Sequence, residues 1–435
     1  MAFHKKTIKD VNLDGKKVLL RADYNVPVDN NGKVLGPYRI LKSIPTVEYL
    51  LKKNCKIVII SHLGRPEVGR PMPKDSLRDV ARYLGTKLDK KVNFVADCCG
   101  PKVQQACQEM KQGEIVMLEN LRLNAGEKDN DKDFAKQLAE ETGADMMVQD
   151  AFGVVHRADA STEAITKLLP SVAGLLLESE YQTIVSAVKE PERPLMAIIG
   201  GAKISDKIGV IEKLIETADI VAVGGAMANM FLVAQKVPIG SSLIEKSDIS
   251  LAKKLLSKAH AEAKKRHFVF YIPQDGVVAR SIDKHAHTRV VDWTSHVAAD
   301  IESYPKSPKK ADYTVTANEK ILDIGPYSCA YLAGAMQMVK TVIWNGPLGV
   351  TEVPSMHGPV GPFGNGTEVV MESLMGEMGD VSNRPYSLVG GGDTAGYIEA
   401  RGLTEHFNHV STGGGASLDL IAGKKLAGVE ALQDK

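Results

Sequence analysis

Short runs of apolar, mostly β-branched residues recur along almost the whole chain, and longer stretches with helical spacing separate them. The runs do not alternate between apolar and polar residues, so each should form a strand that is buried on both faces. Buried strands with helices between them predict an α/β fold with parallel, doubly wound sheets. In chain order the predicted strands are 18–20, 57–60, 115–118, 146–148, 197–199, 220–223, 268–271, 341–344 and 387–389.

The length of the chain indicates more than one domain. Its 435 residues exceed what one hydrophobic core usually serves, and its hydrophobic fraction of 44% is enough for ordered cores. We expect a helix from residue 178 that ends at a Pro-Glu-Arg-Pro turn and joins two lobes. The predicted division is a first lobe at 1–177, an interlobe helix and hinge at 178–193, and a second lobe at 194–410.

The balance of charged and apolar residues argues against several classes of protein. Lys and Arg total 54 against 53 Asp and Glu, so the basic excess of a nucleic-acid-binding protein is missing. No run approaches the ~18 apolar residues that cross a bilayer, which predicts no membrane partner. The first residues lack the apolar stretch of a signal peptide, and the cysteines lack the spacing of a disulfide framework or zinc site. We therefore expect a cytoplasmic protein with reduced cysteines.

Arginines follow the predicted strands of the first half. Ligands of parallel sheets bind beyond the carboxyl ends of the strands, so residues just after each apolar run are the informative ones. Like charges at one sheet edge repel each other unless an anion neutralises them, and the guanidinium group suits phosphate and carboxylate. We therefore predict a small anionic ligand in this half. The arginines are Arg21, Arg65, Arg122 and Arg157.

Glycines follow the predicted strands of the second half, at 200–201, 224–225, 346–349, 390–392 and 413–415. A glycine between a strand and a helix lets backbone amides approach a phosphate group at the positive end of the helix dipole. Lys203 and Lys207 add positive charge, and Asp393 is placed to meet a metal ion on those phosphates. The pattern predicts a kinase that holds ATP in this half and a small anionic acid in the other.

A dehydrogenase remains an alternative. The chain has no G-x-x-x-x-G-K-[ST] stretch and is therefore not a P-loop protein. Gly390-x-Gly392-x-x-Ala395 satisfies the loose dinucleotide-binding pattern, which calls for a carboxylate ~20 residues later to hold the ribose. The sequence at 409–412 is His-Val-Ser-Thr and lacks that carboxylate.

Taken together, the loops resemble those of the phosphoglycerate kinase family over nearly the full chain. The matching stretches are RADYNVP, SHLGRP, ENLRLNAGE, DAFGVVHRADAS, GGAKISDKI, WNGPLGV, GGGDTAG and VSTGGGASL. The resemblance implies reversible phosphoryl transfer between 1,3-bisphosphoglycerate and ADP, giving 3-phosphoglycerate and ATP, with Mg²⁺ as cofactor. It also implies a monomer with two Rossmann-like lobes joined by a hinge helix, whose segment 411–435 returns to the first lobe.

The resemblance implies roles for individual residues. The glycerate ligand should be bound by Asp23, Asn25, Arg39, His62, Arg65, Arg122 and Arg157. The nucleotide should be bound by Gly201, Ala202, Lys203, Lys207, Asn345, Pro347, Glu352, Gly391, Gly392, Asp393 and Thr394, with Asp393 at the metal. The catalytic groups, which would stabilise charge in the transition state, should be Arg39, Lys203, Gly391 and Gly414. No general base is needed, because the acceptor is a carboxylate that is already ionised.

The chain departs from the family pattern at a few positions. Residues 34–38 read Val-Leu-Gly-Pro-Tyr where a Thr-Asp-Asp-like stretch is usual. Asp159 replaces a histidine, Thr351 an aromatic residue, and Ile321 a glycine beside the expected adenine pocket. None of these changes removes a charge that the chemistry needs. A protein that kept the fold but lost catalysis remains a second alternative. The intact Arg39, Arg122, Lys203 and Asp393 count against it.

Overall fold

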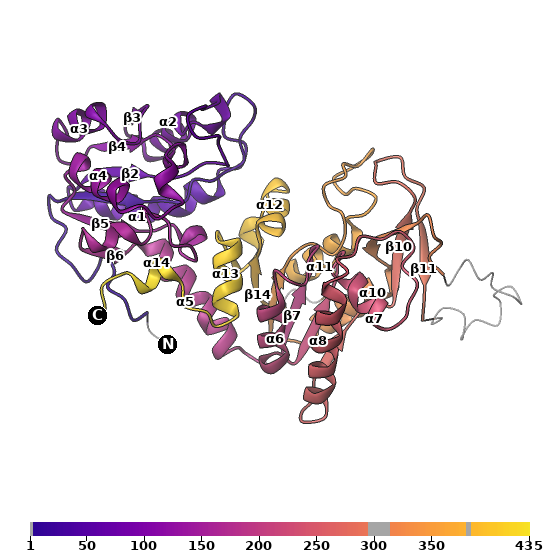
Figure 1. The fold of residues 1–435 in the computed structure, drawn as a ribbon. Helices are drawn as coiled ribbons and strands as arrows, with labels where there is room; N and C mark the ends of the chain where they lie inside the picture. The colour runs from indigo at the N-terminus through magenta and orange to yellow at the C-terminus, as the bar shows by residue number, and fades with distance from the viewer. Residues whose placement is uncertain (1–2, 295–313, 380–383) are drawn as a thin grey trace, which may run out of the picture. The chain divides into compact units, whose positions relative to one another are not determined.

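The computed structural model describes residues 3–294, 314–379 and 384–435 (Figure 1). They form two compact units. The first unit comprises Met1–Val185, Thr412–Leu420 and Lys424–Lys435, and the second comprises Ser186–Ser411 and Ile421–Gly423. The helix expected from residue 178 is α5 (Leu175–Lys189), and the division between the units falls inside it.

The first unit contains a six-stranded parallel sheet with the order β3-β4-β2-β1-β5-β6. Successive residues of β1 enter different clusters, since Leu19 belongs to one hydrophobic core and Leu20 to the other. This confirms that the apolar runs mark strands buried on both faces. The strands are β1 (Lys17–Arg21), β2 (Lys56–Ile60), β3 (Val92–Val95), β4 (Ile115–Leu118), β5 (Met146–Gln149) and β6 (Ser171–Ala173).

Helices cover both faces of this sheet. Helices α1 (Tyr38–Lys52) and α2 (Arg78–Leu88) contribute to the cluster that contains Leu20. Helices α3 (Pro101–Gln108) and α4 (Lys132–Thr142) contribute to the cluster that contains Leu19. Two short helices of the C-terminal segment follow the second unit, α13 (Gly414–Ile421) and α14 (Ala427–Glu430).

The second unit has its own six-stranded parallel sheet, with the order β15-β14-β13-β7-β8-β9. Its strands are β7 (Leu195–Ile199), β8 (Ile220–Val223), β9 (Val269–Tyr271), β13 (Thr341–Asn345), β14 (Tyr386–Gly390) and β15 (His409–Val410). Its helices are α6 (Ile208–Thr217), α7 (Ala228–Ala234), α8 (Asp248–Ala263), α10 (Pro326–Met336), α11 (Asn365–Met375) and α12 (Gly392–Ala400).

A three-stranded antiparallel sheet in the second unit was not predicted. It consists of β10 (Asp275–Ala279), β11 (Arg289–Asp292) and β12 (Lys320–Ile324), in the order β11-β10-β12. Charged residues interrupt its apolar stretches, so the search for continuous apolar runs passed over them. Every strand predicted by this search is present in the structure, but the search did not predict β3, β6 and β15.

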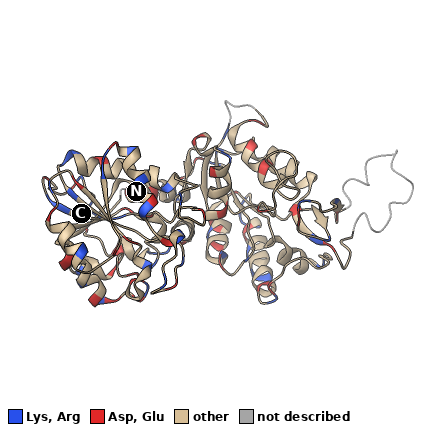
Figure 2. Cartoon of the chain, turned by 90° about the horizontal axis from the view of Figure 1, so that it is seen from above, with Lys and Arg blue, Asp and Glu red and all other residues tan. Residues whose placement is uncertain are grey.

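Charge is spread over both units. Figure 2 shows basic and acidic residues interspersed on the helices of each unit, in keeping with the formal net charge of +1. Among the described residues, no helix combines the length and the apolar character needed to cross a membrane.

Candidate functional site

The first unit gathers polar side chains beyond the carboxyl end of β1. Asp23 and Asn25 follow the strand, and Arg39 lies in the first turn of α1. The Arg39 guanidinium donates from Nη1 to Asp23 Oδ2 at 3.0 Å and to the Asn25 carbonyl at 3.1 Å. The Asn25 side chain in turn accepts a bond from the Gly64 amide at 2.8 Å. The loop after β1 therefore holds the arginine by its carboxylate and its backbone.

Arg21 does not face a ligand, contrary to the expectation for the four strand-end arginines. It is the last residue of β1 and is fully buried. Its Nε donates to Ser161 Oγ at 2.8 Å, and its Nη2 lies 3.7 Å from Glu127 Oε1. A buried cation needs a paired anion, and Glu127 supplies it inside the unit.

His62 follows β2 and is almost completely buried. Its Nδ1 lies 3.3 Å from Arg21 Nη2. Because a guanidinium group can only donate, Nδ1 must accept, and the ring proton sits on Nε2. Burial, followed by the charge of Arg21, holds the pKa of His62 well below its usual range, so the ring is neutral at physiological pH. A neutral imidazole with a protonated Nε2 is a hydrogen-bond donor for an anion.

Arg122 and Arg157 of the first unit lie close enough for their charges to interact. Arg122 is mostly buried in the 3₁₀ turn Leu121–Leu123 and donates to the Gly64 carbonyl. Burial, and next the charge of Arg157, lower the pKa of Arg122 to about 10. Arg157 pairs with Asp159 at 3.3 Å, and its buried Nε has no partner among the described residues. Arg65 is exposed on the loop after β2. Cations close enough to disfavour each other's charge form a site for an anion.

Residues 412–415 begin the C-terminal part of the first unit. The Thr412 amide and hydroxyl both donate to Glu180 Oε1 at 2.7 Å, and Glu180 is fully buried in α5. Gly414 is the first residue of α13. A Cβ atom on Gly413 would lie 2.5 Å from the Phe152 ring. This close approach explains why glycine is required before the helix.

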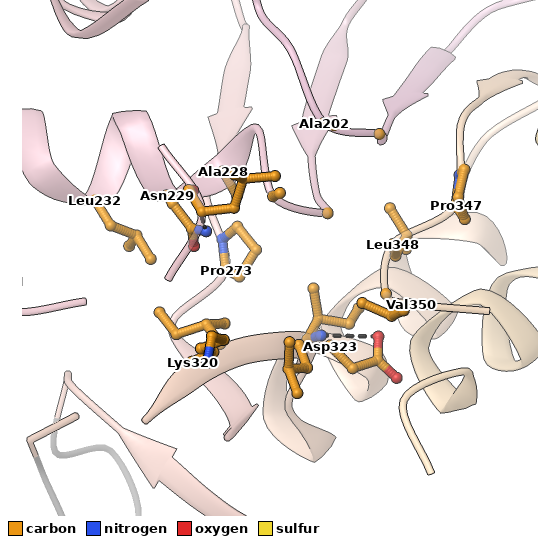
Figure 3. A pocket seen from close by; sticks show the side chains of 18 of the residues that line it. Ala202, Ala228, Asn229, Leu232, Pro273, Lys320, Asp323, Pro347, Leu348 and Val350 are labelled. Carbon is orange, nitrogen blue, oxygen red and sulfur yellow. Dashed lines mark hydrogen bonds between the residues drawn. The ribbon is translucent and has the colours of Figure 1, made fainter. Parts of the chain in front are cut away.

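The second unit contains a cavity of about 240 Å³ (Figure 3). Strand ends of the parallel sheet supply Gly201, Ala202, Pro347 and Asp393, all of which were predicted from the sequence, and Glu352 also lines it. Figure 3 shows Ala228, Asn229 and Leu232 of α7 on one wall and Lys320 across from them. The loops at 201–202, 225–226 and 347–350 and the start of α12 thus line one cavity, whereas the glycines at 413–415, predicted from the same pattern, belong to the first unit.

Several predicted residues hold the loops of this cavity together. Lys207 is largely buried and donates from Nζ to the carbonyls of Gly200 at 2.6 Å and Asn345 at 3.3 Å. Burial lowers the pKa of Lys207 to about 8. Thr394 is fully buried, and its hydroxyl accepts a bond from the Gly346 amide at 2.8 Å. Asn345 Nδ2 is buried without a partner among the described residues. Lys207 and Thr394 therefore bind backbone groups of the site.

Helix α12 presents its N-terminus at the cavity. Gly391 precedes the helix with a φ of +94°, a conformation that glycine adopts at no cost, and Gly392 and Asp393 open the first turn. Lys203 forms an ion pair with Glu245 at 3.5 Å, and both side chains are about half exposed. Within the described residues, no group of three or more His, Cys, Asp or Glu side chains is placed to hold a metal ion. A single carboxylate such as Asp393 fits a metal ion that takes its other ligands from phosphates and water.

Comparisons with known proteins agree with this arrangement. The family model described as phosphoglycerate kinase matches residues 8–424. A phosphoglycerate kinase of Koribacter versatilis is 41% identical over 438 residues, covering 99% of this chain and all of its own. One of Trichodesmium erythraeum is 42% identical over 435 residues with the same coverage.

The chain belongs to the phosphoglycerate kinase family.

Solved structures of the family share the fold. Phosphoglycerate kinase from Coxiella burnetii has a TM-score of 0.76 at 34% identity, and that from Pyrococcus horikoshii has 0.79 at 27% identity. Each comparison covers 98% of this chain and 98% of the other. As a member of the phosphoglycerate kinase family, the protein is a kinase that transfers a phosphoryl group between 1,3-bisphosphoglycerate and ADP in glycolysis. Its substrates are small molecules, phosphoglycerate and adenine nucleotide, and a nucleotide-using kinase generally requires a metal ion.

Sequence reasoning missed the apolar end of the cavity. Its lining includes Leu243, Ile282 and Trp293, which follow none of the predicted strands, and Leu322 of β12. These residues carry no glycine or charge signal, because they are ordinary apolar side chains. The antiparallel sheet brings Ile282, Trp293 and Leu322 to the site, and Leu243 comes from the segment between α7 and α8. Ile321, noted as a departure from the family pattern, also lines the cavity.

Proposed function

We propose that the first unit binds the phosphoglycerate ligand through Asp23, Asn25, Arg39, His62, Arg65, Arg122 and Arg157. The observation that carries this proposal is that Arg157, whose buried Nε has no partner among the described residues, lies close to Arg122. Burial, and next the charge of Arg157, lower the pKa of Arg122 to about 10. Two guanidinium groups at such a short separation repel each other, and a bound phosphate or carboxylate group would offset the repulsion. The neutral His62 ring adds a donor beside them.

Titration calorimetry with 3-phosphoglycerate tests the first site. We expect Arg157→Ala to weaken binding of the acid by about tenfold or more, the scale of one charge-assisted hydrogen bond, without changing ADP affinity. Arg82→Ala is a matched control, because Arg82 is exposed on α2 and its ion pair within the described residues is with the neighbouring Asp79. Unchanged affinity for the acid in Arg157→Ala would contradict the assignment.

We assign the cavity of the second unit to the nucleotide. The backbone amide of Ala202 and those at the start of α12 would bind the phosphates, together with Lys203, and the apolar end would receive the base. The Gly201 amide donates to the Pro347 carbonyl at 3.0 Å and so would hold the loop instead. Lys207 and Thr394 would act through the loop backbones they hold. Asn345 would offer its Nδ2 donor, which has no partner among the described residues, and Pro347 and Glu352 line the cavity. An ADP titration of Gly392→Pro, which removes an amide at the first turn of α12, should show weaker binding. Normal binding would contradict this assignment.

The metal ion in this proposal is Mg²⁺, held by Asp393 and the nucleotide phosphates. Mg²⁺ commonly uses one or two carboxylates plus phosphates and water, which matches the single carboxylate at the start of α12. When bound it would neutralise charge on the phosphates. Replacing Mg²⁺ by Ca²⁺ in a nucleotide titration of the wild type and of Asp393→Asn tests this role. If nucleotide affinity depends on the metal ion equally in the wild type and in Asp393→Asn, the proposed role of Asp393 is contradicted.

The transfer step needs positioning and charge neutralisation. In the glycolytic direction a β-phosphate oxygen of ADP forms the new bond to phosphorus, and the bond to the acyl oxygen breaks, leaving the carboxylate. In reverse the carboxylate attacks the γ-phosphorus of ATP, and no proton has to be removed. Arg39, Lys203 and the amides of Gly391 and Gly414 would stabilise charge on the moving group. A coupled assay with ATP and 3-phosphoglycerate distinguishes this from a non-catalytic binding protein.

We also propose that the enzyme works as a cytoplasmic monomer, with small molecules as its partners and the helix at 178–193 as its hinge. The cysteines of the described chain are free, as expected in a reducing compartment. Acyl phosphates hydrolyse readily, so full closure should require both substrates. Small-angle scattering with each ligand singly and together tests this, and full compaction with nucleotide alone would contradict it. Light scattering of the purified protein reports its mass.

A further inference from the structure

The first turn of α11 makes hydrogen bonds to segments that are distant in the sequence. The Gly366 amide donates to Asp323 Oδ2, on β12, at 2.9 Å. The hydroxyl oxygen of Thr367 accepts a bond from the Leu348 amide, in the loop after β13, at 3.0 Å. Consecutive residues of one helical turn therefore hold two separate segments.

The next residue of the same turn holds a third segment. Glu368 accepts bonds at 2.6 Å from the Tyr397 hydroxyl and from Arg401 Nη1. Tyr397 lies in α12 and Arg401 at its C-terminal end. The carboxylate of Glu368 is buried and its charge is paired, so this contact fixes α12 against α11.

All three segments line the proposed nucleotide cavity. Asp323 and Leu348 are lining residues, and Asp393 lines it from the first turn of α12. Figure 3 shows Asp323, Leu348 and Val350 on the same side of the cavity. The residues Gly366, Thr367 and Glu368 do not line it, and all three are buried. The first turn of α11 therefore lies outside the cavity and is hydrogen-bonded to the segments that line it.

Close backbone contacts leave these segments little freedom. A Cβ atom on Gly349 would lie 2.4 Å from Asp323 Oδ1, and one on Gly366 would lie 2.5 Å from the same oxygen. Distances this short exclude any larger residue at either position. The loop after β13, strand β12 and α11 are therefore interlocked around one carboxylate.

We propose that Thr367 is a positioning residue for nucleotide binding, and that its hydroxyl sets the backbone of the Pro347–Gly349 loop at the cavity. The inference rests on the proposed assignment of this cavity to the nucleotide. Thr367 is fully buried and Leu348 is 1% exposed, so water has no access to replace the bond. Without the hydroxyl, the Leu348 amide either stays unpaired or moves to find a partner. Movement of this loop displaces Pro347, which lines the cavity.

Two variants at this position separate positioning from simple loss of stability. Thr367→Val keeps the shape of the side chain and removes the hydroxyl, whereas Thr367→Ser keeps the hydroxyl. We expect Thr367→Val to raise KM and Kd for ADP by about tenfold, within the range for an unsatisfied buried donor, with little change in KM for the acid. Thr367→Ser should restore ADP affinity to within about twofold of the wild type.

Ser373→Ala is the matched control. Ser373 is equally buried on the same helix, but its hydroxyl donates to the Val369 carbonyl of α11 itself at 2.6 Å. The control should change Tm as Thr367→Val does and leave ADP binding unchanged. If Ser373→Ala weakens ADP binding equally, or if Thr367→Val binds ADP normally, the positioning role is wrong. Should Thr367→Val fail to fold, Thr367→Ala removes the same hydroxyl with a residue that favours helix.

A further variant distinguishes failure of this inference from failure of the cavity assignment. Leu243 is 60% exposed and lines the cavity, so Leu243→Trp adds bulk there without disturbing a core. If Leu243→Trp weakens ADP binding and Thr367→Val does not, only the positioning role of Thr367 is overturned. If ADP binding is normal in both variants, the assignment of the cavity to the nucleotide is overturned as well.

Discussion

The two units build their sites from different parts of the chain. In the first unit the polar groups at the sheet edge are side chains, above all Arg39, Arg122 and the His62 ring. In the second unit the corresponding edge is backbone, because glycines occupy the ends of β7, β8, β13 and β14. The proposed first site would bring charge to a ligand, and the proposed second site would bring amides close to its own ligand.

The difference decides what the surrounding residues do. Charged side chains need charged or polar supports, so the first unit contains the buried contacts of Arg21 with Glu127 and Ser161. A loop that binds through its backbone must be held in one conformation by other residues. In the second unit, Thr394 and Thr367 do this by accepting hydrogen bonds from loop amides. A side chain that the sequence predicts to bind a ligand can therefore bind backbone carbonyls or amides of the site instead. Lys207, bound to two carbonyls, is the clearest case.

The largest effect should come from the cations assigned to the transition state, one in each unit. Arg39→Ala and Lys203→Ala should each reduce kcat by ~100-fold or more, the scale for losing one preorganised donor. A coupled assay measures this, with Arg82→Ala and Lys258→Ala as controls that remove surface charges from the same units. Turnover close to that of the wild type in either site variant would contradict its catalytic role.

The comparison predicts a different kinetic result for Arg122, which should hold the part of the acid that does not react. Arg122→Ala should raise KM for 3-phosphoglycerate by about 30-fold, within the range of a hydrogen bond to a charged group, and change kcat little. Steady-state kinetics with each substrate varied in turn checks this. A loss confined to kcat would place Arg122 at the reacting phosphate instead.

A backbone site should be intolerant of a single methyl group. A Cβ atom on Gly200 would lie 2.1 Å from the Pro347 carbonyl oxygen, so Gly200→Ala should cost about 1–3 kcal/mol of unfolding free energy and weaken ADP binding. In Gly396→Ala the new atom meets nothing within 4 Å and the residue lies in α12, so stability should stay equal or rise. Denaturant unfolding and ADP titration measure both. Equal behaviour of the two variants would show that the loops can shift.

The smallest effect concerns pH. Burial raises the pKa of Asp323 from its ordinary 3.8 to about 7. A carboxyl group with a raised folded-state pKa favours the folded protein most at low pH, and this contribution is lost as pH rises through about 7. The unfolding free energy of the wild type, compared with Asp323→Asn, should therefore fall by on the order of 1–2 kcal/mol between pH 5 and pH 8. A difference independent of pH would contradict the raised pKa.

The continuous apolar runs predicted most strands of both parallel sheets but missed β3, β6 and β15, because the signal is strong only where a strand is buried on both faces and apolar throughout. They could not predict β10, β11 and β12, whose charged residues break the pattern. The same limit applies to the site. The glycine loops were visible in the sequence, whereas Trp293 and Ile282 became part of the cavity only through the antiparallel sheet.

By itself, the sequence determined the parallel sheets, the contrast between arginine and glycine at the strand ends, and the family. Each depends on residues close together in the chain, where period and composition act directly. Only the tertiary structure decided which of the polar groups at the strand ends are buried and paired inside a unit. Arg21 turned inward because Glu127, from a distant segment, neutralises it there. Thr367 fastens the loop after β13 because α11 packs behind it, a contact between segments that no local pattern encodes.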